Sequence, residues 1–328
     1  MDLLGNALLS IKVLANSIGV FDFGGEWGFG LTQAMPDFAC SLTVLEGNCW
    51  FAAANCDGAW LGAGETAVVL NGTRHSFASG PNAPILSLID VLSPIGADTF
   101  EPATRREAPL RLSVGADPGD GAPRTRILAL AYLLREPERS PILSDLPPSF
   151  IIRREAATIF PWLSSLSTYL VEQKGMHLPG YTATASHLAD LMFSSFLRAR
   201  IASNPGAGTG WLKGVSDPQI GRVLSLVHAR PMGRWSVAAM AKEANMAPST
   251  FARRFAELLA QPPMDYVLGI RLNAARDMML NQRMPIAQLA ELAGYRSERA
   301  FRTAFTRRYG RPPRAYLKAH QNAQPRAD

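Results

Sequence analysis

Two stretches near the C-terminal end of the chain repeat each other, and this duplication limits the fold more than any other feature of the sequence. At an offset of 49 residues, Ala238, Ala241 and Ala244 align with Ala287, Ala290 and Ala293. One extra residue shifts the offset to 50, and Phe251, Phe255, Pro262, Pro263 and Tyr266 then align with Phe301, Phe305, Pro312, Pro313 and Tyr316. The sequence therefore predicts two copies of one helical unit.

Each copy has the pattern of a short helix, a sharp turn and a second helix, over about residues 236–259 and 285–309. Apolar residues at helical spacing predict the first helix of each copy. Asn245 and Gly294 follow those helices, and both residue types enter the left-handed backbone region more readily than others. The apolar faces of the second helices would bury Phe251, Phe255, Phe301, Phe305 and Tyr309.

The positive charge of the chain belongs to this region. Residues 216–328 hold 18 Lys+Arg against 8 Asp+Glu, a net charge of +10, whereas residues 1–215 hold 15 against 19, a net charge of −4. Of the 18 cations 16 are arginine, whose planar guanidinium suits phosphate and the major-groove edge of guanine. A basic helix-turn-helix predicts double-stranded DNA as the partner, because a solvated surface on an ordinary helical bundle would explain neither the repeat nor the charge asymmetry.

The exposed sides of the second helices supply the candidate DNA contacts. We expect base edges or adjacent phosphates to be contacted by Arg253, Arg299 and Arg302. The short-range readers would be Ser249, Glu298 and Thr303, beside Thr250 on the same exposed side. Backbone phosphates would be held by Arg254, Arg307 and Arg308. The alternative is that all six arginines serve mainly the sequence-independent attraction to phosphate.

The second copy begins Ile286-Ala-Gln-Leu-Ala-Glu-Leu-Ala-Gly-Tyr-Arg-Ser and continues with Phe301, Phe305, Gly310, Pro313 and Tyr316. With a connecting segment at residues 271–280, it makes residues 235–318 resemble the DNA-binding domain of the AraC/XylS family of bacterial transcription regulators. The resemblance implies two recognition helices, held by a connecting helix, that enter successive major grooves about 34 Å apart. It also implies an activator that contacts RNA polymerase, although repression is equally compatible with the sequence.

Each copy departs from the family pattern at one place. Arg253 of the first copy occupies the common family position two residues past the first Phe, but that position is Thr303 in the second copy, where the arginine is Arg302. In the first copy, Ala260 stands where Gly310 would predict a glycine. We expect these departures to leave the fold intact and to make the base preference unpredictable.

The stretch from about residue 11 to 92 is rich in Val, Leu, Phe, Trp and Gly, in short segments broken by turn sequences, which predicts an antiparallel sandwich or barrel. Gly64, Leu70-Asn-Gly72 and His75 resemble the second motif of the cupin barrels, with Leu70 in place of Pro and Ser79 in place of Asn. The resemblance implies a cupin-type sensor domain, as in many AraC-type regulators.

His75 would be a metal ligand in an enzymatic cupin, but partners for it are lacking in the sequence. The chain has five His, His75 is the only one before His177, and the paired His-x-His of the first cupin motif is absent. We therefore expect a packed or hydrogen-bonded His75, no metal, no cofactor and no catalytic residue. The alternative from another class is a metal-free cupin enzyme fused to a regulatory DNA-binding domain.

All three cysteines, Cys40, Cys49 and Cys56, fall in this same segment. Their spacings match no zinc motif, and reduced buried thiols are the ordinary expectation for a cytoplasmic chain. Their clustering leaves a second alternative, a thiol-sensing regulator in which a pair such as Cys49 and Cys56 forms a disulfide that repacks the barrel.

Composition and linkers predict a multidomain α+β chain. We expect a cupin-like β-barrel sensor at 1–150, a helical dimerisation element at 151–204, a linker at 205–215, the all-α double helix-turn-helix domain at 216–322 and a tail at 323–328. The helical element has two segments, about 156–173 and 184–202, and the resemblance implies that it makes a homodimer. No secretion signal and no run of 18 apolar residues occurs, so we expect a cytoplasmic protein that does not enter membranes.

The remaining candidate site is for the effector. A small molecule sensed by the N-terminal domain would control DNA binding, and paired guanidinium groups suit a carboxylate or a cyclic dinucleotide. The candidate ligands are His75, Arg105, Arg106, Arg111, Arg153 and Arg154, although most arginines in such places are simply solvated.

Overall fold

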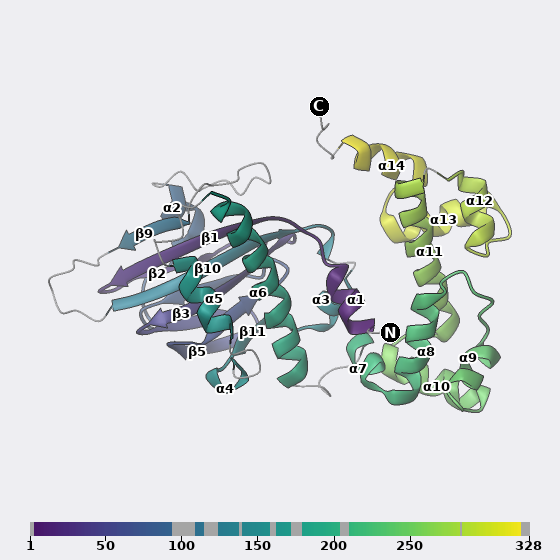
Figure 1. Cartoon of the computed structure of the whole chain (residues 1–328), viewed down its shortest axis with the longest axis horizontal. Coiled ribbons are helices and arrows are strands. Elements are labelled where there is room, and N and C mark those ends of the chain that lie inside the picture. Colours follow the sequence, from purple (N-terminus) through teal and green to yellow (C-terminus); the bar gives the residue numbers. More distant parts are fainter. Residues whose placement is uncertain are drawn as a thin grey trace. The chain divides into compact units, whose positions relative to one another are not determined.

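The computed structural model describes residues 3–93, 109–114, 124–137, 140–157, 162–171, 179–203, 210–282 and 284–322. The chain forms two compact units, one made of Gly5–Ala207 and the other of Met1–Leu4 together with Gly208–Asp328 (Figure 1).

Two β-sheets make up the larger unit. The six-stranded sheet has the order β11 (Ser149–Ile152), β6 (Thr66–Val69), β3 (Phe38–Glu46), β10 (Arg124–Leu134), β1 (Val13–Gly24) and β9 (Leu110–Val114). The five-stranded sheet has the order β5 (Cys56–Gly62), β4 (Asn48–Ala53), β7 (His75–Ala78), β2 (Gly28–Leu31) and β8 (Leu86–Ser87). The strands pair antiparallel except for β1 with β9 and β2 with β8. The predicted cupin-like β domain is confirmed, as an open two-sheet sandwich rather than a closed barrel.

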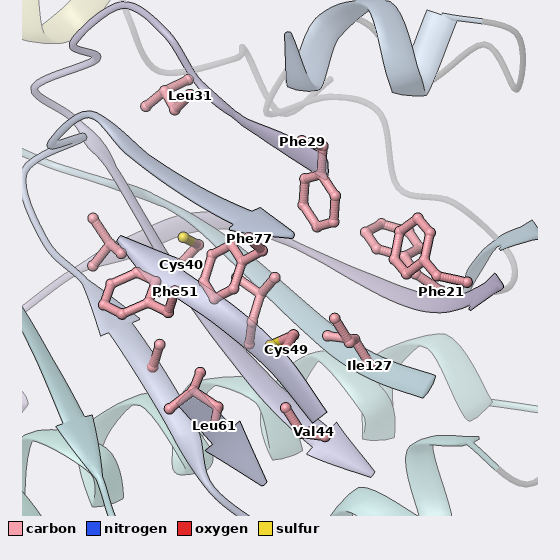
Figure 2. Packing of buried hydrophobic residues seen from close by; sticks show 14 of the residues in the cluster. Phe21, Phe29, Leu31, Cys40, Val44, Cys49, Phe51, Leu61, Phe77 and Ile127 are labelled. Atoms are coloured by element: carbon pink, nitrogen blue, oxygen red, sulfur yellow. The ribbon is translucent and has the colours of Figure 1, made fainter. Parts of the chain in front are cut away.

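The space between the sheets is filled by apolar and aromatic side chains (Figure 2). Alternation along the strands decides which residues enter it: on β3, Cys40, Leu42 and Val44 belong to this core, while Ser41 and Thr43 are not among its members. Phe23 and Trp27 stack with ring centroids 4.1 Å apart. Such close packing of large rings gives the sandwich a rigid interior.

Helix α6 (Tyr181–Ser203) packs on strands of the six-stranded sheet, next to α5 (Trp162–Val171). The Tyr132 hydroxyl donates to the Ala189 carbonyl at 3.1 Å, and Asn16 donates to the Asp190 carboxylate at 2.9 Å. Leu191 of α6 is 45% exposed. Shorter helices of this part of the chain are α1 (Leu3–Leu9), α2 (Leu88–Leu92), α3 (Pro141–Asp145) and α4 (Arg154–Ala157).

The C-terminal unit is helical, as predicted. Its elements are α7 (Trp211–Ser216), α8 (Pro218–Ala229), α9 (Val237–Glu243), α10 (Pro248–Leu259), α11 (Pro263–Gln282), α12 (Ile286–Leu292), α13 (Glu298–Tyr309) and α14 (Pro313–Asn322).

The prediction of a linker at 205–215 is wrong for residues 211–215, which belong to α7. Trp211 is buried and its indole nitrogen donates to the Tyr266 hydroxyl at 2.9 Å, so packing overrides the glycine-rich sequence that precedes the helix. Residues 205–209 and the predicted tail at 323–328 lie outside the described residues.

The helices that the structure describes include none with the length and hydropathy needed to cross a membrane.

Candidate nucleic-acid interface and sensor site

The turn between the two helices has the same backbone geometry in both copies of the repeat. Asn245 has φ 52° and Gly294 has φ 80°, which confirms the predicted left-handed positions. The amide of Met246 donates to the Ala241 carbonyl at 2.9 Å, and the amide of Tyr295 donates to the Ala290 carbonyl at 2.9 Å. This pattern satisfies the last carbonyls of α9 and α12 and fixes where the next helix begins.

Both second helices bury the predicted aromatic residues. Phe251 and Phe255 on α10, and Phe301 and Phe305 on α13, have no exposed surface, so the opposite face of each helix is left to solvent. The predicted contacts that are exposed are Ser249, Thr250, Arg253, Arg299, Thr303, Arg307 and Arg308. The half-buried ones are Arg254, Glu298 and Arg302.

Two of the predicted arginines on α10 already have carboxylate partners. Arg254 contacts the Asp217 carboxylate at 2.5 Å and Gln219 at 3.4 Å. Asp217 itself caps α8 by accepting from the amides of Gln219 and Ile220 at 3.0 and 2.9 Å, so Arg254 joins α10 to α8. Arg253 pairs with Glu257 at 3.0 Å, with both side chains exposed. The predicted contact of Arg254 with a DNA phosphate would require this side chain to leave Asp217.

Helix α11 holds the two copies together. Tyr266 near its start is in edge contact with Phe255 of the first copy, with ring centroids 5.6 Å apart. Leu272, Ala275 and Met279 belong to the core of the second copy. Asn273 accepts from the Tyr309 hydroxyl at 2.8 Å and from Arg308 at 3.2 Å.

A buried hydrogen-bonded chain joins α7, α8 and α11. The Tyr266 hydroxyl accepts from Trp211 and lies within hydrogen-bond distance of Nε2 of His228, at 2.6 Å. Burial lowers the pKa of His228 to about 4, so the ring is neutral and can accept this bond near neutral pH.

His75 is packed between the sheets, as predicted. It is 7% exposed, its Nδ1 donates to the Thr73 carbonyl at 2.7 Å, and its Nε2 lies 3.6 Å from the sulfur of Cys40. Burial lowers the pKa of His75 and outweighs the hydrogen bond to Thr73, which acts in the opposite direction. A neutral ring of this kind supplies no charge for an anionic ligand, and the described residues contain no group of three or more metal-ligating side chains around it.

The three cysteines are free. Burial raises the pKa of Cys40 and of Cys49 to about 12, so neither carries the thiolate that reacts with oxidants. Cys49 is paired with Leu61, five residues along β5 from Cys56. That offset is about 16 Å at about 3.3 Å per residue, whereas a disulfide needs Cα atoms about 4.4–6.8 Å apart. The Cys49–Cys56 pair named from the sequence is therefore not placed to form a disulfide in this fold.

The candidate effector arginines do not come together. Arg111 lies on β9 and donates to the Val171 carbonyl at 3.0 Å, while Arg153 and Arg154 follow β11. Strands β9 and β11 are the opposite edges of the six-stranded sheet, five strand spacings or about 24 Å apart. Arg153 pairs with Glu65 at 3.0 Å, and Arg154 donates to the Ala63 carbonyl. The structure therefore excludes a single effector site that contains Arg111 together with Arg153 and Arg154. Arg105 and Arg106 lie outside the described residues.

Four further cations of the second copy are exposed and were missed among the sequence candidates: Arg296, Arg311, Arg314 and Lys318. They lie before α13, after it and on α14, outside the recognition helix that carries the predicted contacts of this copy. A comparison of charge at equivalent positions of the two copies would have found them.

Comparison with known proteins matches two family descriptions. The cupin family covers residues 2–202, and a helix-turn-helix domain family covers residues 240–319. A putative AraC-like transcription regulator of Streptomyces lividans is 33% identical over 178 residues, 54% of this chain and 58% of that protein. The RCS-specific transcriptional activator RclR of Escherichia coli is 26% identical over 184 residues, 56% of this chain and 64% of that protein. The matches thus span less than two thirds of these relatives.

Solved structures give weaker similarities. The DNA-binding domain of AdpA, in complex with a target DNA, is 27% identical and covers 34% of this chain and 99% of that domain, with a TM-score of 0.31. ToxT of Vibrio cholerae with a bound unsaturated fatty acid is 12% identical over 92% of this chain and 94% of that one, with a TM-score of 0.34. The cupin match over more than half of the chain, the helix-turn-helix match and the named relatives agree. The chain belongs to the AraC-type transcription regulators that carry a cupin-type N-terminal domain.

Proposed function

We propose that the protein is a sequence-specific DNA-binding transcription regulator whose DNA binding is controlled by a small effector sensed in the cupin-type domain. The observation that carries the proposal is the duplicated helix-turn-helix, with two second helices that expose polar and cationic faces and with α11 packed into both copies. Two such helices on one rigid support suit two major-groove segments on the same side of a duplex.

Within this interface, the exposed side chains divide into two kinds. Ser249 and Thr250 at the start of α10 and Thr303 on α13 are short and exposed, and they suit base edges. Exposed Arg299 on α13 also suits them, since it makes no ion pair with any residue that the structure describes. Arg253 and Arg302 would reach bases or adjacent phosphates after release of Glu257 and Glu298, their i+4 and i−4 partners. Arg307 and Arg308 suit backbone phosphates.

For the sensor domain we propose a small-molecule effector that binds one arrangement of the protein better than another, because an effector shifts an equilibrium only by its differential affinity. The structure does not support an anionic ligand bound by His75 and the arginines together, because His75 is neutral and Arg111 is far from Arg153. These residues therefore give no particular support to a cyclic dinucleotide as the effector.

We further propose a homodimer that uses α5 and α6, and activation through contact with RNA polymerase in the cytoplasm. Support for the dimer comes from three large apolar side chains of these helices, Trp162, Tyr169 and Leu191, which stay 36%, 37% and 45% exposed. No catalytic role is proposed, because the relatives found by comparison are named as regulators.

The decisive experiment is selection of genomic DNA fragments by the full-length protein, followed by footprinting of the recovered sites. We expect two protected major-groove segments about 10 base pairs apart on one face of the duplex. Substitution Arg299→Ala should relax base preference at one position of one segment, at a cost of about 1–3 kcal/mol. Recovery of no enriched sequence, with uniform weak protection, would contradict sequence-specific recognition.

A further inference from the structure

The two copies of the helix-turn-helix differ sharply in charge although they share one fold. Residues 246–268, which hold the second helix of the first copy and the start of α11, contain Arg253 and Arg254 against Glu257 and Asp265, a net charge of zero. The equivalent residues of the second copy, 296–318, contain seven arginines and one lysine against one acidic residue, a net charge of +7. The difference in charge thus lies between equivalent surfaces of the two copies and does not come from a difference in fold.

Internal ion pairs widen this difference. In the first copy both arginines of α10 contact carboxylates, Arg253 with Glu257 and Arg254 with Asp217. In the second copy six exposed cations make no ion pair with any residue that the structure describes: Arg296, Arg299, Arg307, Arg311, Arg314 and Lys318. Over the equivalent stretches 246–268 and 296–318, the first copy therefore presents almost no uncompensated charge, whereas the second presents these six cations.

The extra cations surround the recognition helix rather than lying only on it. Arg296 precedes α13, Arg311 follows it, and Arg314 and Lys318 lie at i and i+4 on α14. Their equivalents in the first copy are uncharged: Met246, Gln261, Met264 and Leu268. A surface this broad exceeds what base reading by one helix uses and matches the spread of phosphates along a duplex, about one charge per 1.7 Å of axis.

We infer that the second copy, with Arg296, Arg311, Arg314 and Lys318 beside α13, supplies most of the phosphate contacts of the DNA interface in addition to its base contacts, and that the first copy contributes mainly base contacts. The inference rests on the proposed DNA-binding function. Nearly all of the salt dependence of binding then comes from residues 296–318, because each neutralised phosphate adds about 0.9 to the slope of log K against log salt.

The test uses the full-length chain and a fluorescently labelled duplex of random sequence, about 30 base pairs long, with anisotropy measured between about 50 and 200 mM KCl. We expect the triple variant Arg311→Gln, Arg314→Gln, Lys318→Gln to lower the slope by about 2–3 and to weaken binding at every salt concentration. Arg253→Gln should lower it by less than about 1. Gln261→Ala, at the place equivalent to Arg311, is the matched control and should leave both quantities unchanged.

A triple variant that binds the duplex with the wild-type slope would overturn the inference and would leave an acidic protein as the partner of this surface. Equal losses in the triple variant and in Arg253→Gln would overturn the division between the copies. If the wild-type protein binds no duplex even at low salt, the proposed function itself fails. Circular dichroism verifies folding, and the three single variants, each expected to lower the slope by about 0.9, decide the matter if the triple variant unfolds.

Discussion

Left-handed backbone positions mark the ends of both recognition helices. Gly310 closes α13 at φ 70°, and Ala260 closes α10 at φ 55°, where the sequence comparison had expected a glycine. An L residue with a Cβ atom is disfavoured there by roughly 1–2 kcal/mol. The first copy thus carries backbone strain that the second copy avoids.

Substitution Ala260→Gly should therefore raise the free energy of unfolding of the C-terminal unit by up to about 1 kcal/mol. The reciprocal control, Gly310→Ala, should lower it by about 1 kcal/mol, and an added Cβ at Gly310 meets no atom within 4 Å, so only the backbone cost is measured. Hydrogen exchange of α10 and α13 in the full-length protein gives the readout. Reduced protection of α10 in Ala260→Gly would contradict the prediction.

The sequence predicted the roles of residues that depend on neighbours close in the chain. It did not predict the roles of residues that depend on distant parts of the chain. Asn245 and Gly294 were predicted because a turn is a local structure. The engagement of Arg254 could not be predicted, since its partner Asp217 lies 37 residues away and is brought close only by the packing of α10 against α8. The separation of Arg111 from Arg153 depends on strand order, which no local pattern encodes.

At the scale of elements, α7, α8 and α11 depend on one buried hydrogen-bonded chain through Trp211, Tyr266 and His228. The pKa of His228 is about 4 in the folded unit and about 6.5 when unfolded, so the folded state binds fewer protons in between. The stabilisation by neutral His228 is complete above pH 6.5, is lost as the pH falls, and is exhausted near pH 4.

We expect the stability of this helical unit to fall by about 2 kcal/mol between pH 7 and 5 through His228 alone, since one pKa unit corresponds to about 1.4 kcal/mol. His228→Gln keeps an acceptor for Tyr266 without titrating in this range, and it should flatten the profile. Hydrogen-exchange protection of α8 and α11, corrected for intrinsic rates, measures both proteins. A wild-type profile as flat as that of the variant would exclude this role.

The helical elements were more predictable than the strands. Helices α10 and α13 lie within the predicted ranges 236–259 and 285–309, because caps and prolines are local signals. Residues 211–215 were predicted as linker because nothing in the sequence shows that Trp211 meets Tyr266. The register of β4 and β5, which separates Cys49 from Cys56, is likewise set by pairing and not by composition.

At the scale of the whole molecule, the proposed function requires the cupin-type unit to bind an effector and the helical unit to bind DNA. Two buried thiols with raised pKa values and a neutral His75 favour a ligand over an oxidant as the signal. The two units were also the easiest feature to predict, because charge, repeat and β pattern change near the same place in the chain.

We expect the melting temperature of the full-length protein, scanned across metabolites, cyclic nucleotides and oxidants, to rise with one small molecule by mass-action stabilisation, equally with and without reductant. A double variant, Cys49→Ser with Cys56→Ser, should keep that response. A shift that appears only with oxidant and is reversed by reductant would restore the thiol-sensing alternative and displace the ligand.

Helix α11 has one more consequence, for the DNA rather than for the protein. Its 20 residues form a rod about 30 Å long, at about 1.5 Å per residue, fixed at both ends by the aromatic cores of the two copies. A helix of fixed length holds the two recognition helices at a fixed separation. Many base pairs of a binding site can then change, but insertion of one base pair between its two halves alters both their separation and their rotation about the duplex axis. Selection on promoters should therefore conserve the spacing of the two halves more strictly than their sequence.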